Sequence, residues 1–287
     1  MDEVLSFLKS SLRDGLLPWS AQDSAARQFT LRYAEVEKIA LENGLFPARY
    51  QRNRNMISTE EQLRLFNSRI AVIGCGGLGG YVIEELARLG VGQIVAIDPD
   101  IFEEHNLNRQ ILSYPAILGM PKVYAALERA SQINPAVTVT AVQDSFCVMN
   151  GFELLAGCQV AVDALDSISY RLELAEVCNI AGIPMVHGAI GGWYGHVATQ
   201  FPGETTVQQI YRHWVAGKGI EQQLGNPAFT PAVVASLEVA EVCKILLGKG
   251  ELLRNRKLSI DLLAMEIHEI SYAPAPAASV ELVVHAA

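Results

Sequence analysis

The chain has 287 residues, of which 50% are hydrophobic and 18% are charged, and its formal net charge is −9. This length is sufficient for one large α/β domain or two small ones, and the acidic balance argues against nucleic acid as the main partner. The first residues are acidic where a secretory signal would be basic, no apolar run reaches transmembrane length, and the five scattered cysteines form no C-x-x-C pair. We therefore expect a cytoplasmic protein without membrane contact and without a disulfide framework.

Residues 1–48 are predicted to form a helical N-terminal extension. Apolar side chains of residues 4–12 share one face at helical spacing, and the stretch from Ser24 to Asn43 predicts a longer helix that stops before Gly44. This extension is expected to pack on the core or on a partner subunit, and its residues assign it no chemistry.

From Arg69 onward the pattern alternates strands and helices, which is typical of a mostly parallel sheet covered by helices on both faces. Strands are predicted over 69–73, 93–97, 137–142, 160–164 and 185–188, with helices over 81–89, 122–133 and 169–181. A less regular second half is predicted to add antiparallel strands over 197–201, 258–261 and 266–271, and a helix that is capped by Thr230 and runs from Pro231 to Leu247. The Ala/Pro-rich tail over 273–287 is expected to be loose, with an edge strand over 280–284 as an open alternative.

A glycine-rich turn follows the first of these strands. Gly74, Gly76 and Gly79 fit G-x-G-x-x-G, with Gly77 between them, and Asp98 ends the next strand at the expected distance. Such glycines allow a tight turn, close approach of backbone N–H groups to phosphate and tight helix–strand packing, while the helix N-terminus attracts the anion. Asp98 is placed to accept hydrogen bonds from ribose hydroxyls. The pattern predicts a Rossmann-like nucleotide site.

Two cationic residues follow Asp98 in the sequence. Arg109 lies in the run from Asn106 to Gln110, and Lys122 opens a helix after a Gly-Met-Pro turn. A dehydrogenase that binds NAD has no need of both cations, so that interpretation requires them to be accidental. A reaction at the phosphates of ATP does need them, because charge builds on the α-phosphate and on departing pyrophosphate.

Further motifs occur in order between Arg49 and about Tyr272. They are Arg49-Tyr50-Gln51-Arg52-Asn53, Gly74 to Gly79, Asp98 with Asp100, Asn106-Leu107-Asn108-Arg109-Gln110, Gly119 with Lys122-Val123, Asn134-Pro135, Val162 to Ser167 with Arg171, and Pro231 to Gly248. Together they resemble the adenylyltransferases that activate ubiquitin-like proteins, including bacterial enzymes that act on the sulfur carriers of molybdopterin and thiamine biosynthesis. The resemblance implies an adenylation domain over 49–272, with a nucleotide-binding half over about 69–188 and a carrier-binding half over about 189–272.

The resemblance also implies the reaction. ATP and Mg²⁺ would be used to activate the C-terminal glycine of a small ubiquitin-like sulfur carrier, which ends in Gly-Gly, as an acyl-adenylate with release of pyrophosphate. Lys122 and Arg109 are implied to contact the phosphates of ATP, and Asp166 to hold Mg²⁺. Arg52 is implied to reach the phosphates in the other subunit of a homodimer, which would give two composite sites.

Supporting roles are expected for several neighbours of these residues. Asn106 and Gln110 are expected to orient their loop or to touch the nucleotide, and Asp100 to support the ribose or the metal. Ser167 follows Asp166 where many relatives carry asparagine, and is also expected to line the nucleotide site. Asp163, on the strand itself, is expected to be a buried structural carboxylate.

The chain departs from its apparent relatives in two ways. Many of them bind structural zinc through two C-x-x-C pairs, and this sequence has neither, so we expect no zinc. Some carry a reactive cysteine in the segment that here lies between Cys178 and Cys243, which contains none. The sequence therefore predicts adenylation only, with any sulfur transfer left to another protein.

The sequence is also compatible with two other functions. An ATP-dependent dehydratase that cyclises threonylcarbamoyl-adenosine in tRNA carries elements that fit Asn108-Arg109-Gln110 and Asp166-Ser167 equally well. A non-catalytic nucleotide-binding scaffold is consistent with the absence of both the zinc-binding cysteine pairs and the reactive cysteine. The acidic balance and the motif that contains Arg52 favour a protein substrate over tRNA.

Overall fold

An eight-stranded sheet organises the part of the chain that the computed structural model describes, residues 2–213 and 224–272. Its strands are β3 (Arg69–Ile73), β4 (Gln93–Ile97), β5 (Thr138–Val142), β6 (Val160–Asp163), β7 (Met185–Gly191), β8 (Tyr194–Gln200), β9 (Arg256–Asp261) and β10 (Glu266–Ser271). They lie in the order β10-β9-β8-β7-β6-β3-β4-β5, parallel from β5 to β7 and antiparallel from β7 to β10. The predicted α/β fold with its antiparallel extension is confirmed.

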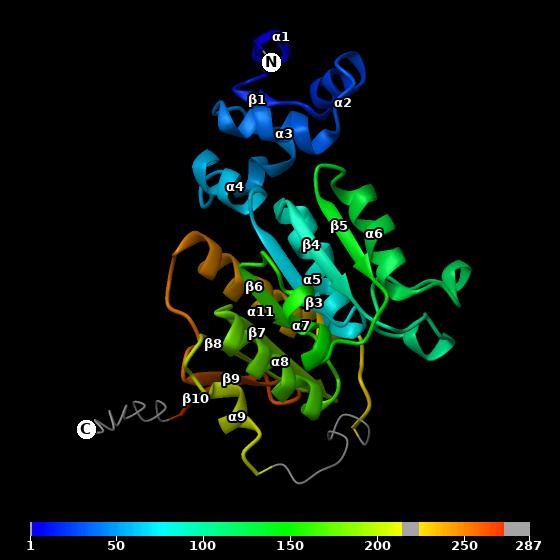
Figure 1. Cartoon of the computed structure of the whole chain (residues 1–287), viewed down its shortest axis with the longest axis vertical. Helices are drawn as coiled ribbons and strands as arrows, with labels where there is room; N and C mark the ends of the chain where they lie inside the picture. Colours follow the sequence, from blue (N-terminus) through cyan, green and yellow to red (C-terminus); the bar gives the residue numbers. More distant parts are fainter. Residues whose placement is uncertain (1, 214–223, 273–287) are drawn as a thin grey trace, which may run out of the picture.

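The order of the parallel strands creates a switch point beside β3. The chain runs from β3 to β4 and β5 on one side, and then returns to β6 and β7 on the other side (Figure 1). At such a point the connections on either side leave in opposite directions, which opens a crevice at the carboxyl ends of the strands. The crevice is therefore bordered by the residues that follow β3, β4 and β6.

Helices cover both faces of the sheet. They are α4 (Thr59–Phe66), α5 (Gly77–Leu89), α6 (Lys122–Ile133), α7 (Val148–Leu154), α8 (Ile168–Ala181), α9 (Thr206–Ile210) and α11 (Phe229–Leu247). Side chains alternate along β3, so that Val72 joins the core under α5 and α11, while Ala71 and Ile73 join the core under α8. Both faces of the central parallel strands β3, β4 and β6 are thus buried, whereas the edge strand β5 is partly exposed.

Three predicted helix boundaries were wrong. The helix predicted over 81–89 begins four residues earlier, because α5 starts at Gly77. The helix predicted from Ser24 to Asn43 is two helices, α2 (Trp19–Gln28) and α3 (Tyr33–Glu42), because Thr30 adopts a left-handed conformation with φ 53° that turns the chain between them. Thr230 does not cap α11, which begins at Phe229, and its hydroxyl instead donates to the carbonyl of Gly192 at 2.7 Å.

Two remaining sequence predictions concern the tail and the membrane. The loose tail over 273–287, with its alternative strand over 280–284, lies outside the described residues. Among the helices of residues 2–213 and 224–272, none combines the length and the apolar character that crossing a bilayer demands.

The N-terminal helices have an apolar cluster of their own. α1 (Asp2–Ser10), α2 and α3 enclose the buried side chains Leu8, Leu17, Ala25, Val36 and Ala40. A short parallel pair, β1 (Leu16–Leu17) with β2 (Phe46–Pro47), then leads into the 3₁₀ helix η1 (Ala48–Asn53). In Figure 1 these helices lie at one end of the molecule, next to α4.

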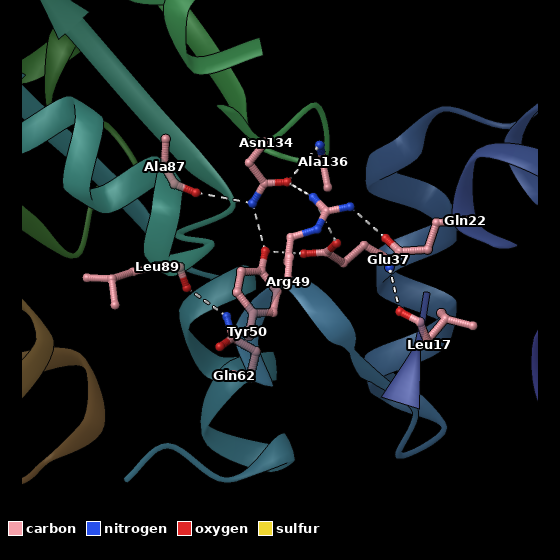
Figure 2. A network of polar contacts seen from close by, with 10 residues as sticks. All are labelled: Leu17, Gln22, Glu37, Arg49, Tyr50, Gln62, Ala87, Leu89, Asn134 and Ala136. Carbon is pink, nitrogen blue, oxygen red and sulfur yellow. Dashed lines mark hydrogen bonds and ion pairs between the residues drawn. The ribbon is translucent and has the colours of Figure 1, made fainter. Parts of the chain in front are cut away.

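A buried polar network joins these helices to the rest of the chain (Figure 2). Arg49 donates to Gln22 at 2.8 Å, donates to the side chain of Asn134, and lies 3.6 Å from the carboxylate of Glu37. The hydroxyl of Tyr50 donates to Glu37 at 2.6 Å and accepts from Asn134 at 2.7 Å. Since Asn134 ends α6, this network fixes the N-terminal helices against the carboxyl end of that helix.

We expect Arg49→Ala to lower the free energy of unfolding by about 3 kcal/mol, because it leaves the buried Glu37 carboxylate without its charge partner. Urea unfolding followed by circular dichroism measures the change. The matched control is Arg32→Ala, which removes an exposed ion pair with Glu35 in the same helices and should cost less than about 0.5 kcal/mol. Equal losses in both variants would contradict a stabilising role for the buried network.

Candidate active site

A cavity of about 430 Å³ opens at the carboxyl ends of β3, β4 and β6. Its volume is in the range of pockets for small molecules. Nine residues that the sequence predicted for the site line it: Gly74, Gly76, Gly77, Asp98, Asp100, Arg109, Gln110, Lys122 and Asp166. The other four predicted residues, Gly79, Asn106, Ser167 and Arg52, are not among the lining residues.

The glycine turn is shaped by two close backbone contacts. Gly74 has φ 97°, and a Cβ there would lie 2.6 Å from the carbonyl oxygen of Ala164. A Cβ on Gly79 would lie 1.7 Å from the carbonyl oxygen of Gly74, so this glycine serves packing and not ligand contact. Between them Gly76 and Gly77, at the amino end of α5, border the cavity with unsubstituted backbone. An anion in the cavity would meet the N–H groups of a helix terminus.

Asp98 ties the glycine turn to the end of β4. Its carboxylate accepts hydrogen bonds from the backbone N–H of Cys75 at 2.6 Å and of Asp100 at 2.8 Å. Burial raises the pKa of Asp98, and the nearby Lys122 ammonium opposes that shift. Each carboxylate oxygen keeps a further lone pair. The predicted ribose contact is therefore compatible with this second role in ordering the turn, and it stays a prediction.

Lys122 is a buried cation in the cavity wall. Its side chain is only 8% exposed, and the ammonium lies 2.8 Å from the carboxylate of Asp100 and 3.8 Å from that of Asp98. This burial excludes a solvated surface lysine at position 122. A phosphate that entered the cavity would compete for this ammonium with Asp100, whose side chain is 64% exposed.

The loop from Asn106 to Gln110 holds one more cation over the cavity. Arg109 donates to the carbonyl of His105 at 2.9 Å, and burial lowers its pKa while the Asp166 carboxylate opposes that shift. Asn106 is buried and orders the loop by accepting from the backbone N–H of Glu103 at 2.9 Å.

Gln110 packs over the glycine turn from the same loop. A Cβ on Gly76 would lie 3.5 Å from the Gln110 amide nitrogen. The amide oxygen of Gln110 is buried and, among residues 2–213 and 224–272, accepts no hydrogen bond. The cavity wall thus contains an acceptor that a ligand donor could satisfy.

Asp166 stands on the loop between β6 and α8. Its side chain is exposed and lines the cavity, and no side chain or backbone group in the described ranges donates a hydrogen bond to it. The backbone of the preceding residue, Leu165, is held at both of its polar groups, because its N–H donates to Asp163 at 3.0 Å and its carbonyl accepts from Arg171. Asp163 is fully buried, as expected of a structural carboxylate. Ser167 instead pairs with Ser169 at 2.8 Å.

Sequence reasoning missed several lining residues: Asp144, Ser145, Phe146, Tyr170, Ile190 and Asn226. Arg171 was named in a motif without a role at the site, and it also lines the cavity. Asp144 follows the carboxyl end of β5, so the rule that identified Asp98 and Asp166 would also have found it. Asn226 carries no such signal. It reaches the cavity from a segment before α11, where its carbonyl accepts from Asn108 at 3.1 Å.

Arg52 lies far from the cavity of its own chain. Its neighbour Tyr50 packs against Gly90 at the carboxyl end of α5, whereas the cavity lies at the amino end of that helix. The helix has 13 residues, which correspond to a length of about 20 Å. Arg52 itself is exposed. The predicted reach into another subunit is the one arrangement in which Arg52 contacts a nucleotide, and it stays a prediction.

Comparison with known proteins identifies the family. A model of the ThiF family matches residues 50–280. The chain belongs to the ThiF family. It is 34% identical over 232 residues to the SAMP-activating enzyme E1 of Haloferax volcanii, a match that covers 79% of this chain and 86% of that protein. It is 31% identical over 223 residues to the sulfur carrier protein adenylyltransferase of Thermus thermophilus, covering 75% and 82%.

A solved structure supports the same fold. E. coli MccB with ATP superposes on this ThiF-family chain with a TM-score of 0.65 at 21% identity, covering 90% of this chain and 84% of MccB. An identity this low establishes the fold alone. The predicted family and the predicted enzyme class, an adenylyltransferase, are confirmed by the sequence relatives.

Two histidines behind the Asp166 loop make stability depend on pH. His187 on β7 and His196 on β8 lie with their Nε2 atoms 3.1 Å apart, and burial lowers the pKa of each below its usual range. Above the unfolded pKa of about 6.5 both states bind no proton, so folding carries no penalty there. As the pH falls below that value the unfolded chain binds protons first, and stability is lost until the lower native pKa is reached.

We therefore expect the free energy of unfolding to fall between pH 7 and pH 5 by up to about 1.4 kcal/mol per pH unit for each histidine. Denaturant titrations across this range measure the slope. His196→Gln should flatten the slope, whereas His268→Gln, a change at an exposed histidine, should not. A slope that both variants share with the unmodified chain would assign the acid sensitivity to other groups.

Proposed function

We propose that this ThiF-family chain activates the C-terminal glycine of a small ubiquitin-like sulfur carrier, using ATP to form an acyl-adenylate. The observation that carries the proposal is that Arg109, Lys122 and Asp166 border one cavity together with the glycine turn. Two cations and a carboxylate around a nucleotide-type turn suit phosphoryl chemistry and not hydride transfer. The names of the relatives, which refer to SAMP and to a sulfur carrier protein, support the substrate class.

The proposed reaction is a displacement at the α-phosphorus of ATP. A carboxylate oxygen of the terminal glycine forms a bond to that phosphorus, and the bond from the phosphorus to the bridging oxygen of the β-phosphate breaks. Pyrophosphate leaves with the electron pair. The buried Lys122 and the half-buried Arg109 would stabilise the charge that accumulates on the phosphates, since cations removed from bulk solvent are worth more than fully solvated ones.

The residues of the cavity fit both ATP and Mg²⁺. The glycine turn would hold phosphate, Asp98 the ribose, and the unpaired amide oxygen of Gln110 would accept from the nucleotide. Asp166 and Asp100 both line the cavity, and their carboxylates would offer the oxygen ligands that Mg²⁺ prefers. When bound, Mg²⁺ would supply positive charge to the departing pyrophosphate.

The proposal includes two partner surfaces. The carrier would enter with its Gly-Gly tail, which is thin enough for a narrow approach to the cavity. Trp193 and Phe229 lie with ring centroids 4.5 Å apart and are both partly exposed, so they are candidates for contact with the carrier body. A second copy of this chain would supply Arg52 to the phosphates, which makes the proposed enzyme a homodimer with two composite sites.

ATP–pyrophosphate exchange tests this function directly. We expect exchange that requires Mg²⁺ and a carrier protein that ends in Gly-Gly, and that disappears when the same carrier lacks its last two residues. ATP binding is measured separately by calorimetry. If ATP binds but no member of a panel of carriers supports exchange, the dehydratase or the non-catalytic scaffold becomes the better interpretation.

A further inference from the structure

A cluster of polar side chains, three of which are buried, lies directly behind the loop that carries Asp166. It consists of five side chains from different elements: Asp163 at the end of β6, Arg171 on α8, His187 on β7, His196 on β8, and Tyr211 just after α9. His187 contacts Asp163 at 2.6 Å, His196 at 3.1 Å and the Tyr211 hydroxyl at 3.2 Å. Arg171 donates to the Tyr211 hydroxyl at 2.7 Å. With the guanidinium this close, a bound cation is disfavoured, and the cluster is a hydrogen-bond network.

The neighbours of each group restrict the direction of its hydrogen bonds. Asp163 is a carboxylate, so the Nδ1 atom of His187 donates to it and the Nε2 atom is left as an acceptor. The oxygen of Tyr211 accepts from Arg171, and it lies 3.2 Å from Nε2 of His187, the lone pair of which also faces Nε2 of His196. Tyr211 therefore connects Arg171 to the Asp163–His187 pair.

Both arms of this network end on the backbone of the same residue, Leu165. Asp163 accepts from the N–H of Leu165 at 3.0 Å, and Arg171 donates to the carbonyl of Leu165. Leu165 immediately precedes Asp166, so a shift of either arm would change the direction of the Asp166 carboxylate. Tyr211 does not line the cavity, whereas Arg171 does. Tyr211 can therefore act on the site through Arg171 and His187 without touching the cavity.

We propose that Tyr211 is a positioning residue for adenylation, which holds the Leu165 peptide through Arg171 and His187 and so directs Asp166 into the cavity. The kinetic part of this inference rests on the proposed function, and the structural part does not. Through Tyr211, the region after β8 would contribute to the nucleotide site without contacting the nucleotide directly.

Tyr211→Phe removes the hydroxyl alone, and the ring that packs beside His187 and His196 stays. Hydrogen–deuterium exchange of the whole chain, without substrates, should show about tenfold faster exchange in a peptide over residues 164–170. A peptide over residues 74–79 should be unchanged. The matched control is Tyr33→Phe, which loses a hydroxyl that donates to Asp23 at 2.7 Å in the N-terminal helices, and which should alter neither peptide.

In the pyrophosphate-exchange assay, Tyr211→Phe should lower kcat about tenfold while the KM for ATP changes less than about twofold, because the other phosphate contacts remain. Unchanged exchange over 164–170 would overturn the inference whether or not the chain is an adenylyltransferase. Faster hydrogen exchange with an unchanged kcat would reduce the cluster to a structural role. If the unmodified chain supports no carrier-dependent reaction, the proposed function fails, while hydrogen exchange still decides whether Tyr211 holds the loop.

Discussion

Asp166→Ala should reduce carrier-dependent ATP–pyrophosphate exchange by at least about 10²–10³-fold, the order of magnitude expected when a group that stabilises charge in the transition state is removed. The carboxylate lines the cavity and has Arg109 as its charged neighbour. It is exposed and contributes little to packing, so the thermal midpoint of the variant should stay within a few degrees of the unmodified chain.

The controls for this variant separate charge from fold. Glu176→Ala removes an exposed carboxylate from α8, the helix that follows the Asp166 loop, and should leave exchange unchanged. Asp166→Asn keeps the size of the side chain and loses its charge, so it should be nearly as inactive as the alanine variant. Substantial exchange by Asp166→Ala in the presence of Mg²⁺ would refute the metal-binding role of this residue.

The sequence predicted the parallel half of the sheet well because its strands are short and its central strands are apolar and buried on both faces. It also located the nucleotide cavity, since each parallel strand delivers its following residue to one edge: Gly74 after β3, Asp98 after β4, and the loop to Asp166 after β6. These predictions depend on local patterns and on one topological rule, both of which can be read from a single chain.

The features that were missed depend on tertiary contacts. Thr30 gives no signal for its left-handed conformation, because Thr has an ordinary propensity for helices and strands. The assembly of Arg171, His187 and Tyr211 brings together residues from three elements that are separated along the chain. Asn226 approaches the cavity only because its segment is bonded to the loop of Asn108. Spacing in sequence does not encode such contacts.

The motif that contains Arg49 and Arg52 illustrates how neighbouring residues can have different roles. Arg49 and Tyr50 point inward and connect the N-terminal helices to the carboxyl ends of α5 and α6 (Figure 2). Arg52, on the same 3₁₀ helix, is exposed at that end of the molecule. The cavity lies at the amino ends of the same two helices, so a rigid chain cannot bring Arg52 to its own cavity.

This geometry gives the proposed trans arrangement a decisive test. Arg52→Ala alone should lose most exchange activity, and so should Asp166→Ala alone. In a heterodimer of the two variants, the site that belongs to the Arg52→Ala chain keeps its own Asp166 and receives Arg52 from its partner. That site should be active and the other site should not, which gives roughly half the activity of the unmodified dimer in a twofold assembly.

Differently tagged chains, purified through both tags after co-expression, provide heterodimers of known composition. The matched control pairs Asp166→Ala with Lys122→Ala, two changes in residues that border the same cavity. In that heterodimer each site lacks one of its own groups, so no activity should return. Recovery in the Arg52 pair but not in the Lys122 pair, together with an inactive Arg52→Ala homodimer, would establish Arg52 as a contribution from the second subunit. Absence of recovery in both pairs would contradict the trans arrangement, and a fully active Arg52→Ala homodimer would place Arg52 outside the reaction.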